Sequence, residues 1–88
     1  MRLRPGAVEW RAVEGEIVAL DVPGSSYLAV NATGAALWPL LESGSTTQEL
    51  AATLTSRYGI SDEQSAHDVA DFLQVLRGRG LLEDIETA

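Results

Sequence analysis

Residues 27–44 of the chain read YLAVNATGAALWPLLESG, and they change from a strand pattern to a helix pattern within a few positions. In the strand part, Leu28 and Val30 share one face while Tyr27 and Ala29 share the other, because side chains alternate along a strand. The helix part is apolar almost all round, as is typical of a helix buried on several sides. The stretch therefore predicts a strand followed directly by the central helix of a small domain.

Two more strand patterns precede this stretch. The segments AVEWRAVE and EIVALDV are rich in β-branched and aromatic residues, and they meet at Glu14-Gly15, where glycine permits the positive φ of a tight hairpin. Pro23-Gly24 favours a type II turn before the third segment, SYLAVN. The pattern predicts a three-stranded antiparallel sheet with strands at about residues 7–14, 16–22 and 26–31.

The remainder of the chain predicts three helices, so the expected fold class is α+β. Pro39 lies inside the first helix and predicts a bend or an early end there, because proline has no N–H to bond the Ala35 carbonyl. Capping boxes that start at Thr46 and Ser61 predict where the second and third helices begin. The three helices are expected at about residues 32–42, 47–58 and 62–79.

Apolar stripes predict the core faces of the second and third helices. The stripe of the second helix is Leu50, Ala51, Leu54 and Tyr58. The stripe of the third helix is Ala66, Val69, Ala70, Leu73 and Leu76. Phe72 and Val75 lie on the third helix at a flank far from the centre of its stripe, next to Asp68. A flank exposed to solvent would normally carry polar residues. Either this pair covers one end of the sheet, or it forms one wall of a groove.

The other wall of such a groove would come from the third strand. In a sheet whose strands follow chain order, this strand has one unpaired edge that exposes the main-chain groups of residues 27–30. Edges are usually defended by charge or proline, and SYLAV has neither. Either another part of the fold covers the edge, or the edge is open to an added strand from another chain.

The composition excludes several classes of function. The 88 residues include no cysteine and one histidine, which excludes a thiol nucleophile and any cysteine or multi-histidine metal site within a single copy. We expect His67 to be exposed to solvent, and the chain contains no P-loop, dinucleotide motif or hydrolase elbow. The sequence thus predicts a protein that is not an enzyme and that holds no metal or cofactor.

The formal net charge of −7 disfavours nucleic acid as a partner, because the chain repels phosphate. The six arginines form no helical stripe of the kind that reads a DNA groove. No apolar run is long enough to cross a membrane, and none near Met1 is typical of a signal peptide. We therefore expect a single cytoplasmic domain over residues 1–88 that binds neither nucleic acid nor membrane.

In this order, the elements resemble the PqqD-like family, the winged helix-turn-helix modules known as precursor peptide recognition elements of ribosomally synthesised, modified peptides (RiPPs). The resemblance covers about residues 8–83 and is carried by YLAVN at 27–31, TGAALW at 33–38, and FL at 72–73 followed by GLL at 80–82. The hairpin segment WRAVEGEIV is most similar to the stand-alone leader-binding subunit of split lasso-peptide B proteins.

The resemblance implies non-catalytic binding of the leader segment of a ribosomally made precursor peptide, which would lie antiparallel along the third strand. The implied contact residues are Tyr27, Leu28, Ala29, Val30, Asp68, Val69, Phe72, Leu73, Val75 and Leu76. The implied partners, besides the leader, are a transglutaminase-like cysteine protease and an asparagine-synthetase-like cyclase of lasso-peptide biosynthesis.

Two alternatives stay open at the level of sequence. One is a PqqD-type peptide chaperone for another modification pathway, such as pyrroloquinoline quinone biosynthesis, in which the module serves a radical enzyme. The other is a winged-helix DNA-binding regulator, which uses the same order of helices. A regulator needs a cationic recognition helix, whereas the helices here carry mainly negative charge.

Overall fold

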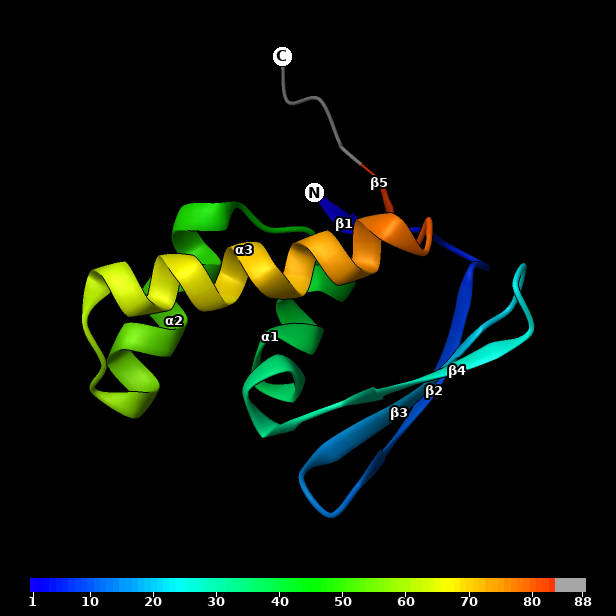
Figure 1. Ribbon diagram of the computed structural model, residues 1–88, viewed down its shortest axis with the longest axis horizontal. Coiled ribbons are helices and arrows are strands. Elements are labelled where there is room, and N and C mark those ends of the chain that lie inside the picture. The colour runs from blue at the N-terminus through cyan, green and yellow to red at the C-terminus, as the bar shows by residue number, and fades with distance from the viewer. Residues whose placement is uncertain (84–88) are drawn as a thin grey trace.

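The computed structural model describes residues 1–83 (Figure 1). The elements in chain order are β1 (Arg2–Leu3), β2 (Val8–Val13), β3 (Glu16–Asp21), β4 (Ser26–Val30), α1 (Ala32–Ser43), α2 (Thr47–Tyr58), α3 (Asp62–Gly78) and β5 (Leu82–Glu83). Strands β2, β3 and β4 form an antiparallel sheet in that order, and α1 lies between this sheet and the pair α2 and α3 (Figure 1). The predicted α+β class, a three-stranded antiparallel sheet followed by three helices, is confirmed.

Two turns join the strands of the three-stranded sheet. Glu14 and Gly15 have positive φ angles of 52° and 82°, which is the conformation of a two-residue type I′ hairpin. The second turn is not the predicted type II turn, because its positive φ, 52°, lies at Ser25 rather than at Gly24. The buried Asp21 carboxylate accepts the Gly24 N–H at 3.1 Å, and this bond holds the glycine in an ordinary conformation.

The sheet has a covered inner face and an open outer face. Ile17, Ala19 and Val30 lie on the inner face and are buried, so the inward position predicted for Val30 is confirmed. Leu28 is directly opposite Ala19 and is partly buried against the same core. Tyr27 lies on the outer face and is 72% exposed. The helices therefore cover only one side of the sheet (Figure 1).

α1 is the central helix of the fold. Its largest buried side chains are Leu37, Trp38 and Leu41. The early end expected at Pro39 is wrong, because the helix continues to Ser43. Pro39 itself is exposed, whereas the apolar side chains on both sides of it are in the core. Their burial offsets the one main-chain hydrogen bond that proline cannot make.

α2 and α3 each begin at a predicted capping residue. The Thr46 and Ser61 hydroxyls accept the N–H groups of Glu49 and Gln64, in both cases at 3.1 Å. Gly59 follows α2 in the left-handed conformation, with φ of 65°. The local signals in the sequence therefore mark the helix ends correctly.

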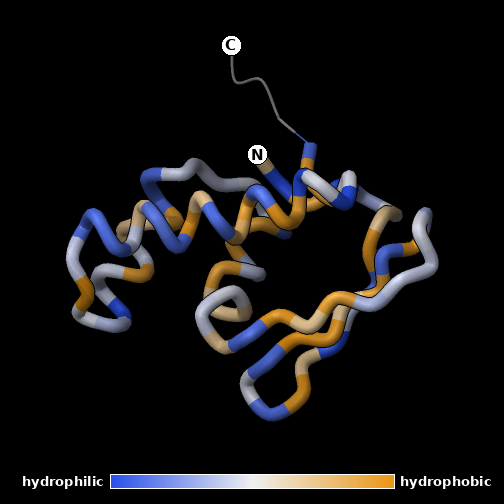
Figure 2. Tube along the Cα trace, in the orientation of Figure 1, coloured by the Kyte–Doolittle hydropathy of each residue, from blue (hydrophilic) through white to orange (hydrophobic). Residues whose placement is uncertain are grey.

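The buried faces of these two helices contain most of the predicted stripes, since Leu50, Leu54, Val69, Leu73 and Leu76 are all buried. On α3 the buried residues are Ser65, Val69, Leu73 and Leu76. Ala66 and Ala70 are exposed, and on α2 Tyr58 is also exposed. The hydroxyls of Thr55 and Ser65 lie 2.7 Å apart across the contact between α2 and α3. Ser65 lies four residues before Val69 and shares its buried face, and this hydrogen bond satisfies the hydroxyl there. Hydrophilic and hydrophobic segments alternate along α3 accordingly (Figure 2).

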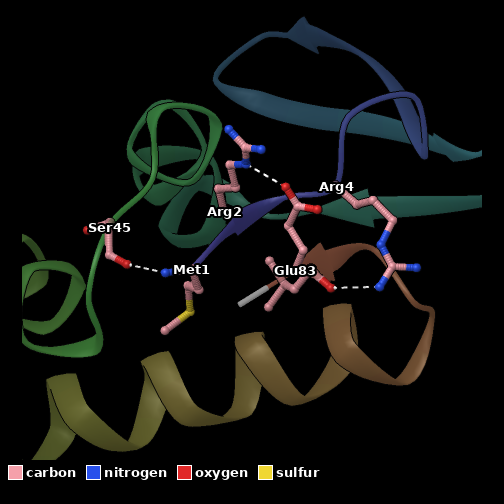
Figure 3. A network of polar contacts seen from close by, with 6 residues as sticks. Met1, Arg2, Arg4, Ser45 and Glu83 are labelled. Carbon is pink, nitrogen blue, oxygen red and sulfur yellow. Dashed lines mark hydrogen bonds and ion pairs between the residues drawn. The ribbon is translucent and has the colours of Figure 1, made fainter. Parts of the chain in front are cut away.

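The two ends of the described chain meet in a second sheet, whose strand β1 the sequence did not predict. β1 pairs with β5 in antiparallel register, Arg2 with Glu83 and Leu3 with Leu82. Arg2 Nε and Glu83 Oε1 lie 2.5 Å apart, and the N-terminal amino group donates to the Ser45 carbonyl at 2.8 Å (Figure 3). Both leucines are buried in the core, so this small sheet closes the hydrophobic core at the end of α3.

Apolar burial should contribute more to this closure than the ion pair does. Leu82→Ala is expected to lower the free energy of unfolding by about 2–4 kcal/mol, because Leu82 is 6% exposed and its truncation leaves a cavity. Arg2→Ala removes an ion pair whose side chains are 43% and 31% exposed, and should change the same quantity by less than about 1 kcal/mol. Urea unfolding followed by circular dichroism measures both variants. Equal losses would contradict this ranking.

Candidate functional site

β4 is the outer strand of the sheet, and its main chain is open on the side away from β3. In a two-residue hairpin the two residues that flank the turn, here Val13 and Glu16, are hydrogen-bonded to each other. Every second residue of β3, counted from Glu16, therefore bonds to β2. The intervening residues bond to β4, which directs the N–H and C=O groups of Tyr27 and Ala29 to the open edge. Within residues 1–83 no strand pairs with this edge, as predicted.

A hollow lies where the end of β4 leads into α1, and α3 forms its other side. Its volume is about 340 Å³. The residues that line it are Asn31, Thr33, Gly34, Leu37, Asp68, Asp71, Phe72 and Val75. We call this hollow the α1–α3 groove. Its lining combines aliphatic and aromatic side chains with two carboxylates, which suits a peptide better than a purely apolar ligand.

The shape of the α1–α3 groove depends on a close approach at Gly34. A β-carbon at this position would lie 2.6 Å from Val30 Cγ1 and 3.0 Å from Phe72 Cε1. Carbon atoms do not normally come as close as the first of these distances, so α1 can approach β4 and α3 only because glycine has no side chain. Phe72 is thereby seated against the junction of β4 and α1.

A second contact joins β4 to the end of α3. Arg79 Nη1 donates to Ser26 Oγ at 3.1 Å, at the first residue of the strand. From Phe72 to Arg79 the helical rise is about 10 Å, and the strand from Ser26 to Val30 spans about 13 Å. β4 and α3 therefore run alongside each other in opposite directions, with Val75 between the two contacts.

Charge is divided between the two ends of this site. Asp68 and Asp71 line the groove at the α1 end. Asp71 also lies 3.2 Å from His67, whose side chain is 69% exposed, as expected from the sequence. Arg79 places a cation at the other end, beside β4. A bound chain would thus meet negative charge at one end and positive charge at the other.

The ten residues predicted as contacts fall into three groups. Those that line the α1–α3 groove are Asp68, Phe72 and Val75. Those on the open strand with at least partly exposed side chains are Tyr27, Leu28 and Ala29. Those in the core, at most 3% exposed, are Val30, Val69, Leu73 and Leu76. The side chains of the last group support the groove from behind and do not face it.

Sequence reasoning missed the side of the groove that α1 forms. The residues concerned are Asn31, Thr33, Gly34 and Leu37. Asn31 and Thr33 precede or begin a helix, where their expected role is capping, and Asn31 does accept the Gly34 N–H at 3.0 Å. The one signal for a site was the glycine itself, since glycine in the first turn of an apolar helix indicates a close approach. Nothing in the sequence marked Asp71 as a site residue, because only the packing of α3 brings it to the groove.

Other kinds of site find no support in the described part of the chain. No cluster of three or more potential metal ligands occurs within residues 1–83. In the same range, no helix has the length and apolar character that crossing a bilayer requires.

Together, the three helices, the sheet and the open edge define a small winged-helix module with a strand edge beside its third helix. A sequence model of the PqqD family, described as coenzyme PQQ synthesis protein D, matches residues 16–82. The chain belongs to the PqqD family. Among curated proteins, the comparison found no match.

Solved structures are similar to the chain over nearly its whole length. One, "TbiB1 in Complex with the TbiA(beta) Leader Peptide", has a TM-score of 0.85 and 28% sequence identity, and the match covers 99% of this chain and 100% of that chain. Another, "Lasso peptide synthetase B1 complexed with the leader peptide", has a TM-score of 0.77 and 28% identity, with 91% and 93% covered. In both structures the similar protein is bound to a leader peptide.

Gly34→Ala tests the close approach that shapes the groove. Alanine normally favours a helix over glycine by about 1 kcal/mol, but here its β-carbon would overlap Val30, which is buried and β-branched. We expect a loss of about 1–3 kcal/mol in the free energy of unfolding and a shift of the aromatic resonances of Phe72, the single phenylalanine.

The matched control is Gly78→Ala at the end of α3, where an added β-carbon meets nothing within 4 Å. This variant should be neutral or stabilised by up to about 1 kcal/mol. Urea unfolding and NMR spectra measure both variants. If Gly34→Ala were as stable as its control and left the Phe72 resonances in place, the tight contact would be wrong.

Proposed function

We propose that this protein binds the leader segment of a ribosomally synthesised precursor peptide and delivers it to the maturation enzymes of lasso-peptide biosynthesis. The observation that carries the proposal is the open edge of β4 alongside the apolar flank of α3. Membership of the PqqD family and the leader peptides bound by both similar structures support it.

In this proposal the leader adds to the sheet as a strand antiparallel to β4. Tyr27 and Ala29 direct their main-chain donors and acceptors to the open edge, where a new strand can use them. Each such bond contributes a net stabilisation of about 0.5–1.5 kcal/mol, and all peptides can form it. Main-chain pairing therefore supplies affinity, and selectivity must come from the side chains of the groove.

The α1–α3 groove is proposed to provide this selectivity. Alternate side chains of an added strand point toward α3, where an apolar leader residue would contact Phe72 and Val75. In the antiparallel direction, the N-terminal part of the leader lies near Asp68 and its C-terminal part near Arg79. A basic residue early in the leader and an acidic residue later would complement these charges.

The role is one of presentation rather than catalysis. We propose that the bound precursor is handed to a transglutaminase-like cysteine protease and to an asparagine-synthetase-like cyclase. Because ribosomes make the precursor, the proposal places this step in the cytoplasm. The similar lasso peptide synthetase B1 favours this pathway over a role in pyrroloquinoline quinone biosynthesis. The carboxylates of Asp68 and Asp71 repel phosphate, which disfavours a DNA-binding regulator.

Ala29→Pro tests strand addition. Proline removes an N–H that points to the open edge and that β3 does not use, so leader binding should be abolished while the fold survives. Ala29→Ser is the control, because it keeps the N–H at the same position of the open edge and changes only a small side chain. Fluorescence anisotropy with a labelled synthetic leader peptide of a lasso-peptide precursor measures binding, and circular dichroism checks folding. Binding by a folded Ala29→Pro protein would contradict strand addition.

Val75→Asp tests the side-chain wall of the groove. Val75 is 47% exposed, so a carboxylate there should cost little stability. It should weaken leader binding by about tenfold or more, since the bound peptide would bury an unpaired charge. Val13→Asp is a matched control, because Val13 is 44% exposed and does not line the groove. Equal effects of the two substitutions on anisotropy, or no leader binding by the parent chain at micromolar concentration, would overturn the proposed site.

A further inference from the structure

A second hollow lies on the other side of α1. It has a volume of about 460 Å³ and is enclosed by the β2–β3 hairpin, α1 and the end of α2. The residues that matter for its chemistry are Trp10, Ala36, Trp38, Pro39, Arg57 and Tyr58. We call it the hairpin pocket. It shares no lining residue with the α1–α3 groove, so a ligand in one leaves the lining of the other free.

The hairpin pocket is lined by two tryptophans, one buried and one partly exposed. Trp38 is fully buried, and its indole Nε1 has no hydrogen-bond partner within residues 1–83. The ring of Trp10 meets it edge to face, with centroids 6.0 Å apart and an angle of 69° between the planes, and Trp10 itself is 39% exposed. A group that enters the pocket therefore meets the exposed part of the Trp10 ring in front of the buried Trp38 ring.

The pocket also carries a cation without a partner. The side chain of Arg57 makes no hydrogen bond or ion pair with any other described residue, and it is the only basic side chain among the described lining residues. Glu16 borders the pocket from the hairpin, so the positive charge is confined to the side formed by α2. In a chain with a net charge of −7, an isolated arginine beside an apolar hollow favours an anionic group.

α1 contributes apolar walls to the same pocket. Ala35, Ala36 and Pro39 line it with small or ring-shaped apolar side chains, and these leave room for a larger group. The pocket thus combines an apolar volume and two indole rings with one guanidinium group.

We propose that the hairpin pocket is a second binding site, which takes an apolar side chain flanked by a carboxylate from a partner protein. The apolar side chain fills the space between Trp10 and Ala36, and the carboxylate pairs with Arg57. This inference does not rest on leader binding, since the two sites lie on opposite sides of α1 and have separate linings.

The indole resonances of the two tryptophans report directly on this pocket. In ¹H–¹⁵N spectra of the full chain, N-acetyl-phenylalanine, which has an aromatic ring and a carboxylate, should shift both indole signals with a saturable, millimolar dissociation constant. N-acetyl-phenylalaninamide has the same ring without the charge and should bind several-fold more weakly. No saturable shift of the Trp38 signal, or equal affinity for the two probes, would overturn the proposal.

Arg57→Ala should abolish the preference for the carboxylate probe, because it removes the cation and leaves the core intact. Arg11→Ala is the matched control, since Arg11 is exposed on the outer face of the sheet and does not line the pocket. A preference that survives Arg57→Ala, or that Arg11→Ala also removes, would contradict the proposed ion pair. Anisotropy with the labelled leader should be unchanged in both variants, which separates this site from the α1–α3 groove.

Discussion

At Gly34 the first turn of α1 comes so close to its neighbours that a β-carbon would lie 2.6 Å from Val30 Cγ1. The contact arises because only Asn31 separates the last residue of β4 from the first residue of α1, so strand and helix must meet at a sharp junction. Phe72 packs against the same point from α3. This one constraint sets where the sheet edge lies relative to α3, and the α1–α3 groove is the space that results.

An open strand edge is a risk for a small domain, because it can pair with other chains. Here the open strand is only five residues long, and the carboxylates of Asp68 and Asp71 stand beside its end. Both features limit non-specific pairing and leave the main-chain groups of Tyr27 and Ala29 available. An edge of this kind suits reversible capture of an extended peptide better than a permanent interface, since few main-chain bonds are gained. α1 then separates this edge from the hairpin pocket, so one buried helix supports two surfaces.

Prediction from the sequence succeeded where the signal was local or periodic. The open edge could be predicted because hairpins place consecutive strands side by side, and Phe72 and Val75 could be singled out because they depart from the helical stripe. The prediction failed for Ala66 and Ala70, which periodicity placed in the core. Val69, Leu73 and Leu76 are buried as expected, but Ser65 shares their face in place of the alanines, because its hydroxyl finds a partner in Thr55 of α2.

The sequence by itself determined which elements form and in what order, because caps such as Thr46 and Ser61 and the turn at Glu14-Gly15 act within a few residues. Only the tertiary structure decided that α1 forms one side of the groove and that β1 pairs with β5. Both outcomes depend on contacts between residues far apart in the chain. Gly34 lies against Phe72, and Arg2 pairs with Glu83. A glycine in the first turn of an apolar helix indicates a close approach, but neither Gly34 nor Arg2 indicates its partner, because that partner is fixed only when the core packs.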